Sequence, residues 1–463
     1  MIYGSLIQVS RVFGGEVDVG ALTAFIRKCG QNISIDLGIH VGAGARAVLE
    51  RLDTYSDAAL AKTQGAGATD ERAIALLASS IGNQAYTLAY ADAFWLGQIS
   101  LDEGRLDEAE SYFQQYQRYS ERMLAREPGN VDAWVEVSYA SNSLGSVAQA
   151  RGDNRAAAAA YQRSIALKRR ALSRRPGDHV LQAELADSLS WLGSARLEDG
   201  ELREAIELFN QEQTELTALR AAAPTELIWT YRLVGAVQRH ALLLSATGND
   251  SAAADELRPI VVLAQALTQH DPSNRLWQKE LLNVEVLGAA VQTNLGDLPQ
   301  ALDLQIAIAT DLARLTALDP ANLTGMLIEA ANLTNLAETL LYMGRPREAA
   351  ERLQKALDAI RRGTGPARGA RELQQKVARS LVGLAEVRVA LGERPAALEA
   401  CREAITTLQP LIRLDAHNYE TQDLWVRAHI CVGEGDKVAA TKQWLAQIGY
   451  RQAGYLRFLS QQQ

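Results

Sequence analysis

The sequence predicts an all-α protein, a right-handed α-solenoid of antiparallel helical hairpins. A glycine followed five residues later by alanine, as in Gly152 and Ala157, recurs at a step of 48 residues. The glycines of this series are Gly104, Gly152, Gly200, Gly248, Gly296, Gly344 and Gly392. Proline keeps the same step from Pro128 to Pro320. Fixed periods of about 20 to 50 residues indicate repeat architectures. The low aromatic content, 6%, and the many Ala and Leu residues favour packed helices.

One repeat shows how each hairpin is built. Residues 131–150 carry apolar side chains at the spacing of one helix face, which predicts the first helix. Gly152-Asp153-Asn154 is the expected turn, and a second helix follows from Arg155 to about residue 174. Pro176 ends it, because proline lacks a backbone N–H and restricts the residue before it. Each helix is about 30 Å long at 1.5 Å per residue.

The repeats do not begin at the first residue. Residues 1–68 lack the period and contain many glycines, so we expect an irregular, partly helical region there, with helices near 18–28 and 45–62. Gln64 to Ala68 is the expected linker, and Thr69 can cap the first regular helix. Residues 69–463 should form the solenoid of seven repeats. A shortened last hairpin is expected around Gly435, with a closing helix over 444–458.

Small residues predict where the helices approach one another. Alanine recurs five residues after each turn glycine, and a glycine or alanine recurs seven residues before it. These positions are Ala109, Ala157, Ala205, Ala253, Ala301, Ala349 and Ala397, and Gly97, Gly145, Gly193, Ala241, Ala289, Ala337 and Ala385. Larger side chains there should overpack the interface, typically at a cost of about 1–3 kcal/mol.

These residues resemble the tetratricopeptide repeat (TPR). Leu144-Gly145, Ala157 and Tyr161 stand at the spacings of its Leu-Gly and Ala-x-x-x-Phe positions, and the repeats around Gly97 and Gly193 match equally well. Later repeats lose the Leu-Gly pair and replace the aromatic residue by Leu257, Gln305, Leu353 and Cys401. The period of 48 residues, against about 34 in the family, implies longer helices.

The first 97 residues resemble something else. Ser10 to Glu16, Phe25 to Lys28 and Asn83 to Leu96 look like the region around the last extracytoplasmic loop of fourteen-helix major facilitator drug:proton antiporters. No transport-site motif is included, and no span of 18 apolar residues is present, so transport is not implied. The resemblance is either a remnant of gene fusion or an accident of helical composition.

Charge and cysteine content restrict the function classes. The net charge of −8 disfavours a nucleic-acid binder, including an RNA-reading helical repeat. Cys29, Cys401 and Cys431 form no CxxC motif or even-numbered framework, which favours a reducing compartment. The N-terminus lacks a basic segment before its short apolar run. We therefore expect a cytoplasmic protein without a membrane span.

No motif predicts catalysis, a cofactor or a metal. Gly42-x-Gly44-x-x-Ala47 superficially resembles a dinucleotide fingerprint, but the acidic residue that should follow comes too early. Gly363 to Gly369 lies among arginines, which could hold a phosphate, although a solvated loop between repeats is the simpler interpretation. His429 and Cys431 are a close pair without the further ligands that zinc needs. We therefore expect a non-enzyme.

The remaining prediction concerns a surface. The TPR resemblance implies that the first helices line a concave groove, and that positions six and three before the Leu-Gly glycine and one after it face this groove. The candidates are Tyr139, Asn142, Asp187, Ser190, Gln238, Asn283, Thr334, Glu338, Arg379 and Glu386. The expected function is a scaffold or adaptor that binds a peptide or protein. The alternative is a sensor or regulatory subunit whose kinase or DNA-binding effector is on another chain.

Overall fold

The computed structural model describes residues 93–318, 323–362 and 370–462. The chain divides into two compact units, 1–129 and 130–463. In the first unit, residues 93–102 are helical and are followed by α5. The expectations for residues 1–68, for the antiporter-like stretch up to residue 92, for Pro320 and for the Gly363–Gly369 loop lie outside the described residues. The start of the solenoid at residue 69 therefore stays a prediction.

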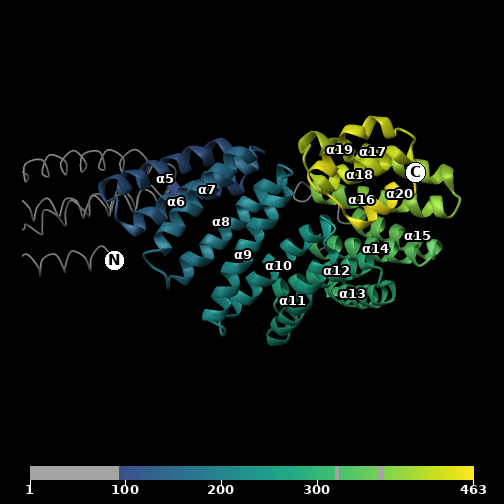
Figure 1. Ribbon diagram of the computed structural model, residues 1–463, viewed down its shortest axis with the longest axis horizontal. Helices are drawn as coiled ribbons and strands as arrows, with labels where there is room; N and C mark the ends of the chain where they lie inside the picture. Colours follow the sequence, from purple (N-terminus) through teal and green to yellow (C-terminus); the bar gives the residue numbers. More distant parts are fainter. Residues whose placement is uncertain (1–92, 319–322, 363–369, 463) are drawn as a thin grey trace, which may run out of the picture. The chain divides into compact units, whose positions relative to one another are not determined.

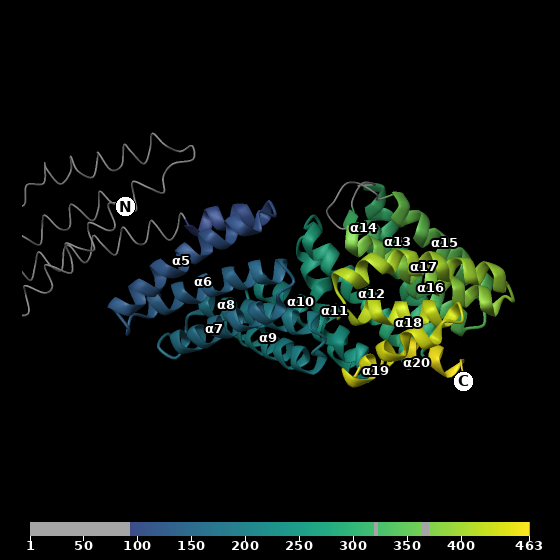
Figure 2. The same cartoon turned by 90° about the horizontal axis from the view of Figure 1, so that it is seen from above.

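The second unit consists of consecutive helices, and no strand occurs among the described residues (Figures 1 and 2). Even-numbered helices from α6 to α18 are the first helices of the hairpins, and odd-numbered helices are the second. The bounds are α5 Leu106–Arg126, α6 Val131–Ala150, α7 Asn154–Leu172, α8 His179–Glu198, α9 Leu202–Ala222, α10 Leu227–Ala246, α11 Asp250–His270, α12 Arg275–Leu295, α13 Leu298–Leu318, α14 Leu323–Tyr342, α15 Pro346–Arg362, α16 Ala370–Ala390, α17 Arg394–Leu414, α18 Tyr419–Cys431, η1 Gly435–Val438, α19 Ala439–Gln447 and α20 Ala453–Ser460. The expected class, an all-α solenoid of TPR-like antiparallel hairpins, is confirmed.

The repeated glycines serve the turns. All seven glycines of the 48-residue series adopt a positive φ, between 73° and 88°. L-residues with a side chain rarely adopt this left-handed conformation, whereas glycine does so freely. The next such glycine is Gly433, with φ 81°, two residues before the position expected from the sequence. Gly435 instead begins the short helix η1.

The small residues sit where helices meet. The seven repeated alanines are at most 1% exposed. A Cβ on Gly145 would lie 2.6 Å from the Tyr161 ring, and one on Gly193 would lie 2.8 Å from the Phe209 ring. Within the first unit, a Cβ on Gly97 would lie 2.5 Å from Phe113. The glycine of the TPR-like Leu-Gly pair therefore leaves room for an aromatic ring from the second helix of the same hairpin.

The C-terminal segment, residues 439–460, leaves the repeat pattern. The expected single closing helix is two helices, α19 and α20, which Figures 1 and 2 show in yellow beside α18. The Arg451 N–H donates to the Ala246 carbonyl oxygen at 2.8 Å. Arg457 Nη2 donates to the Asn294 carbonyl oxygen at 3.2 Å, 163 positions earlier. A cluster of buried apolar residues joins this segment to α9 and α10.

The cysteines correct one expectation. Cys401 on α17 and Cys431 at the end of α18 form a disulfide, with their Cα atoms 6.4 Å apart. The bond arises because the last hairpin brings together two cysteines that lie 30 positions apart. Disulfides persist mainly in oxidising compartments. The cysteine content therefore no longer favours a reducing compartment, and the cytoplasmic location stays a prediction. None of the described helices combines the length and apolar character needed to cross a bilayer.

Candidate functional site

The first helices of five successive hairpins surround a cavity of about 300 Å³ in the second unit. Side chains from α10, α12, α14, α16 and α18 form most of its wall, and Tyr450 and Gln452 of the C-terminal segment complete it. The polar and charged members of the lining are Gln238, Ser245, Asn283, Thr293, Asn294, Thr334, Asn335, Glu338, Gln375, Lys376, Arg379, Glu386, Tyr419, Glu420, Asp423, Arg427, Tyr450 and Gln452. We call this feature the concave cavity.

Six of the ten groove candidates line the concave cavity: Gln238, Asn283, Thr334, Glu338, Arg379 and Glu386. Thr334 is buried and bonds to Ser380 of the next repeat at 3.0 Å. The other five remain partly exposed. The structure thus brings these residues together, and their binding role stays a prediction.

The other four candidates, from α6 and α8, do not line the concave cavity. The Tyr139 hydroxyl donates to the Glu184 carboxylate, and Asn142 Nδ2 donates to Ser188 Oγ at 3.0 Å. Asp187 forms an ion pair with Arg232. Ser190 lies close to the buried carboxyl group of Glu212, whose pKa burial raises and Ser190 helps to lower. These side chains join neighbouring helices of the solenoid to one another.

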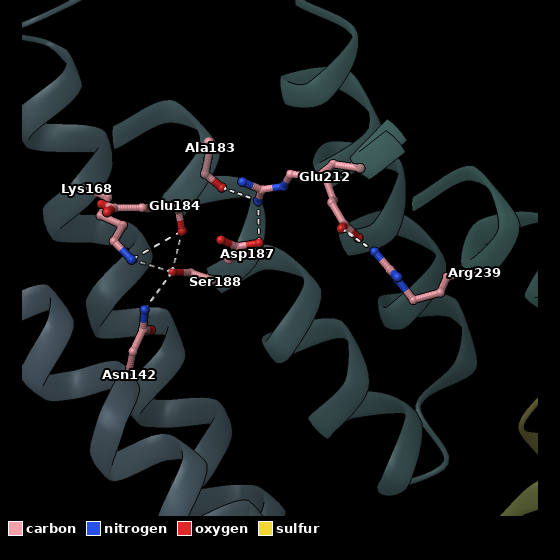
Figure 3. Close-up of polar contacts among 9 residues, drawn as sticks. Asn142, Lys168, Ala183, Glu184, Asp187, Ser188, Glu212 and Arg239 are labelled. Carbon is pink, nitrogen blue, oxygen red and sulfur yellow. Dashed lines mark hydrogen bonds and ion pairs between the residues drawn. The ribbon is translucent and has the colours of Figure 1, made fainter. Parts of the chain in front are cut away.

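A buried lysine joins the hydrogen bonds around Asn142 and Ser188 (Figure 3). Lys168 Nζ, on α7, donates to Ser188 Oγ at 2.8 Å and to the Glu184 carbonyl oxygen at 3.2 Å. Burial lowers the pKa of Lys168 to about 8, although Glu184 and Asp187 favour its charged form. A lysine beside a serine can activate a nucleophile. Here the two residues are 1% and 0% exposed and do not line the concave cavity.

The concave cavity has a basic end. Lys376, Arg379, Gly383 and Glu386 follow the spacing of one face of α16, and all four line the cavity. Neither Lys376 nor Arg379 makes a hydrogen bond or ion pair with any residue that the structure describes. Burial, with a smaller contribution from Arg379, lowers the pKa of Lys376, and Glu420 opposes this shift. Two basic side chains therefore line the cavity with donors that the described residues do not use.

The other end is acidic. Arg427 Nη1 lies 3.4 Å from Glu386 Oε1, and Arg427 Nε lies 3.6 Å from Asp423 Oδ1. These are ion pairs without hydrogen-bond geometry, since Glu386 Oε1, Asp423 Oδ1 and Arg427 Nε are buried without a hydrogen-bond partner. Burial raises the pKa of Glu386 to about 7, against the opposing effect of Arg427. Glu338 accepts a hydrogen bond from Tyr342 at 2.6 Å.

The C-terminal segment closes the concave cavity beside this acidic end. The Tyr450 hydroxyl donates to Asp423 Oδ2 at 2.9 Å. A Cβ on Gly454 would lie 2.5 Å from Glu338 Oε1, so the backbone passes directly over that carboxylate. Closure by residues far along the chain distinguishes this cavity from the open groove that the sequence predicts.

Several lining residues were absent from the sequence prediction. Asn335 and Gly383 lie four residues after predicted or equivalent positions on the same helix face, so helical spacing could have identified them. Arg427 stands 48 residues after Arg379, so continuing the same step into α18 could have identified it, and Asp423 lies four residues before it on the same helix. Tyr450 and Gln452 lie outside the repeats, and no sequence pattern indicates that they line the cavity.

Comparisons with known proteins identify the repeat in two places. Residues 93–122 and 330–367 each match a family model described as tetratricopeptide repeat. No curated protein resembles the chain closely enough to count as a relative. Nothing in these comparisons supports the antiporter resemblance.

Solved structures of repeat proteins are similar at low identity. A tetratricopeptide repeat protein from Parabacteroides merdae is 14% identical, covers 72% of this chain and 99% of its own, and has a TM-score of 0.41. The Rap protein complexed with Competence and Sporulation Factor is 12% identical over 82% of this chain and 100% of its own, with a TM-score of 0.42. The apo quorum sensor NprR from B. thuringiensis is 14% identical over 79% and 98%, with a TM-score of 0.40.

Proposed function

We propose that the chain is a non-catalytic scaffold or adaptor that holds a peptide or protein segment at the concave cavity of its second unit. The observation that carries this proposal is the convergence of unpaired donors on one hollow surface. Lys376 and Arg379 line the cavity and make no hydrogen bond or ion pair to the described residues, and the side-chain amides of Asn335 and Gln238 line it as well. Polar groups that converge in a concave site are typical of binding sites.

The two family matches support the interaction class, because tetratricopeptide repeats stack helical hairpins into extended concave binding surfaces. The buried Lys168–Ser188 pair supplies no accessible nucleophile, which agrees with a non-catalytic role. A regulatory subunit that acts on an effector chain would use the same surface, so partner identity separates the two functions. We place the protein in the cytoplasm in this proposal.

Partner capture tests the proposal. The full chain is used as bait in a lysate of the source cell, beside a variant with Asn283→Ala and Arg379→Ala. The matched control carries Lys355→Ala and Glu399→Ala, which replace exposed charges on the second helices α15 and α17. We expect the control to retain a protein that the cavity variant loses. A partner that is retained equally by all three baits would place binding elsewhere and contradict the proposal.

A further inference from the structure

Residues 450–460, which we call the lid, lie over one side of the concave cavity and include α20. Tyr450 and Gln452 form part of the cavity wall. The backbone at Gly454 passes directly over Glu338, because a Cβ there would lie 2.5 Å from Glu338 Oε1. The lid is therefore the part of the wall that the repeats themselves do not supply.

Three carboxyl groups beneath the lid interact with one guanidinium. Arg427 Nη1 lies 3.4 Å from Glu386 Oε1, and Arg427 Nε lies 3.6 Å from Asp423 Oδ1. Glu338 also acts on Arg427, and Arg379 acts on Asp423 but not on Glu386. Glu386 is therefore influenced by two neighbouring carboxyl groups and by the single cation of Arg427.

The closed lid holds these groups away from water without enough hydrogen bonds. Glu386 Oε1, Asp423 Oδ1 and Arg427 Nε are buried and have no hydrogen-bond partner among the described residues. An ionised carboxylate is costly to bury in this way. Burial raises the pKa of Glu386 to about 7 against the opposing effect of Arg427, and Glu338 and Asp423 add to the rise. A proton on the carboxyl cluster removes this cost, and opening the lid removes it through hydration.

Other titratable groups pack around the same carboxyl groups on α14, α16, α18 and the lid. Burial raises the pKa of the nearby tyrosines, so they stay neutral: Tyr342, Tyr419, Tyr450 and Tyr455. Arg457 of the lid lies over the Tyr342 ring and donates to the Asn294 carbonyl oxygen. Glu420 acts on Tyr450 and on Lys376, whose pKa burial lowers. Lys376 stands ten residues before Glu386 on α16, about 15 Å along the helix axis.

Gly449 connects the lid to α19. Its φ is 83°, which glycine adopts freely, and no atom lies within 4 Å of a Cβ placed there. Leu445 of α19 is fully buried, so α19 stays fixed while the chain turns after it. α20, Ala453–Ser460, has eight residues, and an isolated helix of this length is marginal in water. When the lid leaves the cavity, its backbone amides therefore lose their protection.

We propose that the lid closes over the concave cavity when the carboxyl cluster of Glu338, Glu386 and Asp423 holds a proton, and opens when that proton passes to solvent. This inference goes beyond the proposed binding function, and lid movement is measured without a partner. The closed lid binds the proton more tightly than the open lid. Its contribution to closure is therefore fully present below about pH 4.5, the ordinary pKa of Glu, and is lost as the pH rises through about 7.

Hydrogen exchange of the lid amides tests this inference on the unmodified full chain. Exchange is followed by mass from pH 5 to pH 8 and corrected for the intrinsic rate. We expect the opening constant of α20 to rise at least about tenfold between pH 5 and 7 and then to level off, since one proton is released per opening. The helices α10, α12 and α14 should not share this rise. No rise in α20, or the same rise in all four helices, would overturn the inference.

Two variants separate the proton from the other contacts of the lid. Glu386→Gln keeps a neutral group of the same shape, so α20 should stay protected and lose the rise with pH. Arg457→Gln removes a contact that does not titrate in this range, so it should increase opening about tenfold at every pH and keep the rise. Glu399→Gln, an exposed change on α17, should alter neither.

The two variants also define the contradicting results. A rise that persists in Glu386→Gln would assign it to another group and overturn the inference. A rise that disappears in Arg457→Gln would show that it does not come from the carboxyl cluster. Where a variant fails to fold, exchange in the unmodified chain still decides whether the lid opens with pH.

Discussion

The backbone N–H of Arg451 donates to the carbonyl oxygen of Ala246 at 2.8 Å, which joins the C-terminal segment to the last residue of α10. Neighbouring contacts reinforce this connection. A Cβ on Gly200, in the turn after α8, would lie 2.7 Å from the Trp444 ring, so that ring packs against the turn. A repeat array in which units contact only their neighbours would have no such link. The second unit is therefore bridged across its concave side.

Removing an anchor of this bridge should destabilise helices far away in sequence. Tyr455 is 3% exposed and packs in the cluster that includes Leu202 and Phe209 of α9. We expect Tyr455→Ala to lower the free energy of unfolding by about 3–5 kcal/mol, the usual cost of deleting a buried aromatic ring. It should also speed hydrogen exchange in α9 and α10. Leu456→Ala is the control, because Leu456 is 46% exposed; equal effects of the two changes would argue against the bridge.

The fit between Gly145 and Tyr161 predicts a compensating pair. A Cβ on Gly145 would lie 2.6 Å from the ring, so Gly145→Ala should cost about 1–3 kcal/mol by overpacking. Tyr161→Leu should recover part of this loss in the Gly145→Ala chain, since two other repeats pair Ala241 with Leu257 and Ala337 with Leu353. Urea unfolding of the single and double variants measures the coupling. Purely additive effects would contradict direct contact.

Glu386 should make stability depend on pH. Its pKa is raised to about 7 by burial, so the folded chain binds more protons than the unfolded chain between about pH 4.5 and 7. This carboxyl group therefore stabilises the fold at the low end of that window, and its contribution falls as the pH rises. Other buried carboxyl groups titrate nearby, so the contribution of Glu386 is measured as the difference in the free energy of unfolding between the unmodified chain and Glu386→Gln at each pH. Glu399→Gln, a change at an exposed position, should leave the pH dependence of the unmodified chain unaltered.

Lys168 should make the free energy of unfolding rise with pH, opposite to the effect of Glu386, and should do so at higher pH. Its pKa is lowered to about 8 by burial, so the unfolded chain binds more protons than the folded chain between about pH 8 and 10.5. The free energy of unfolding should therefore rise with pH through this window. Lys168→Met should remove that rise, whereas Lys355→Met, at an exposed position, should not. A rise that persists in Lys168→Met would assign it to another group.

The disulfide should contribute directly to stability. It closes a loop between residues 30 positions apart, and such bonds typically stabilise by about 2–4 kcal/mol. We expect a reductant to lower the urea midpoint of the unmodified chain but not that of the Cys401→Ser, Cys431→Ser variant. Identical midpoints with and without reductant would show that the bond is absent. Thiol blocking at lysis followed by mass measurement reports the state in the cell, and with it the compartment.

The helical fold could be predicted from the sequence because one period governs the turns and the packing. Gly152 adopts the left-handed backbone conformation of the turn, Ala157 is a small residue buried between helices, and both positions recur every 48 residues. The same step reaches into the site, since Arg427 stands 48 residues after Arg379. The part of the wall that the C-terminal segment supplies could not be predicted, because Tyr450 and Gln452 lie outside the repeats and reach the cavity through tertiary contacts alone. Tyr139 and Asn142 occupy the right register, yet neighbouring repeats supply their hydrogen-bond partners.

Site-specific photo-crosslinking tests the central claim most directly. A photoreactive amino acid is placed at Asn335, in the concave cavity, or at Lys355, exposed on α15, and the full chain is irradiated in its own cell. We predict that a protein or peptide is linked from position 335 and not from position 355, and that Arg379→Ala abolishes the link. Linking of the same partner from position 355 alone would contradict the claim that the concave cavity is the binding surface.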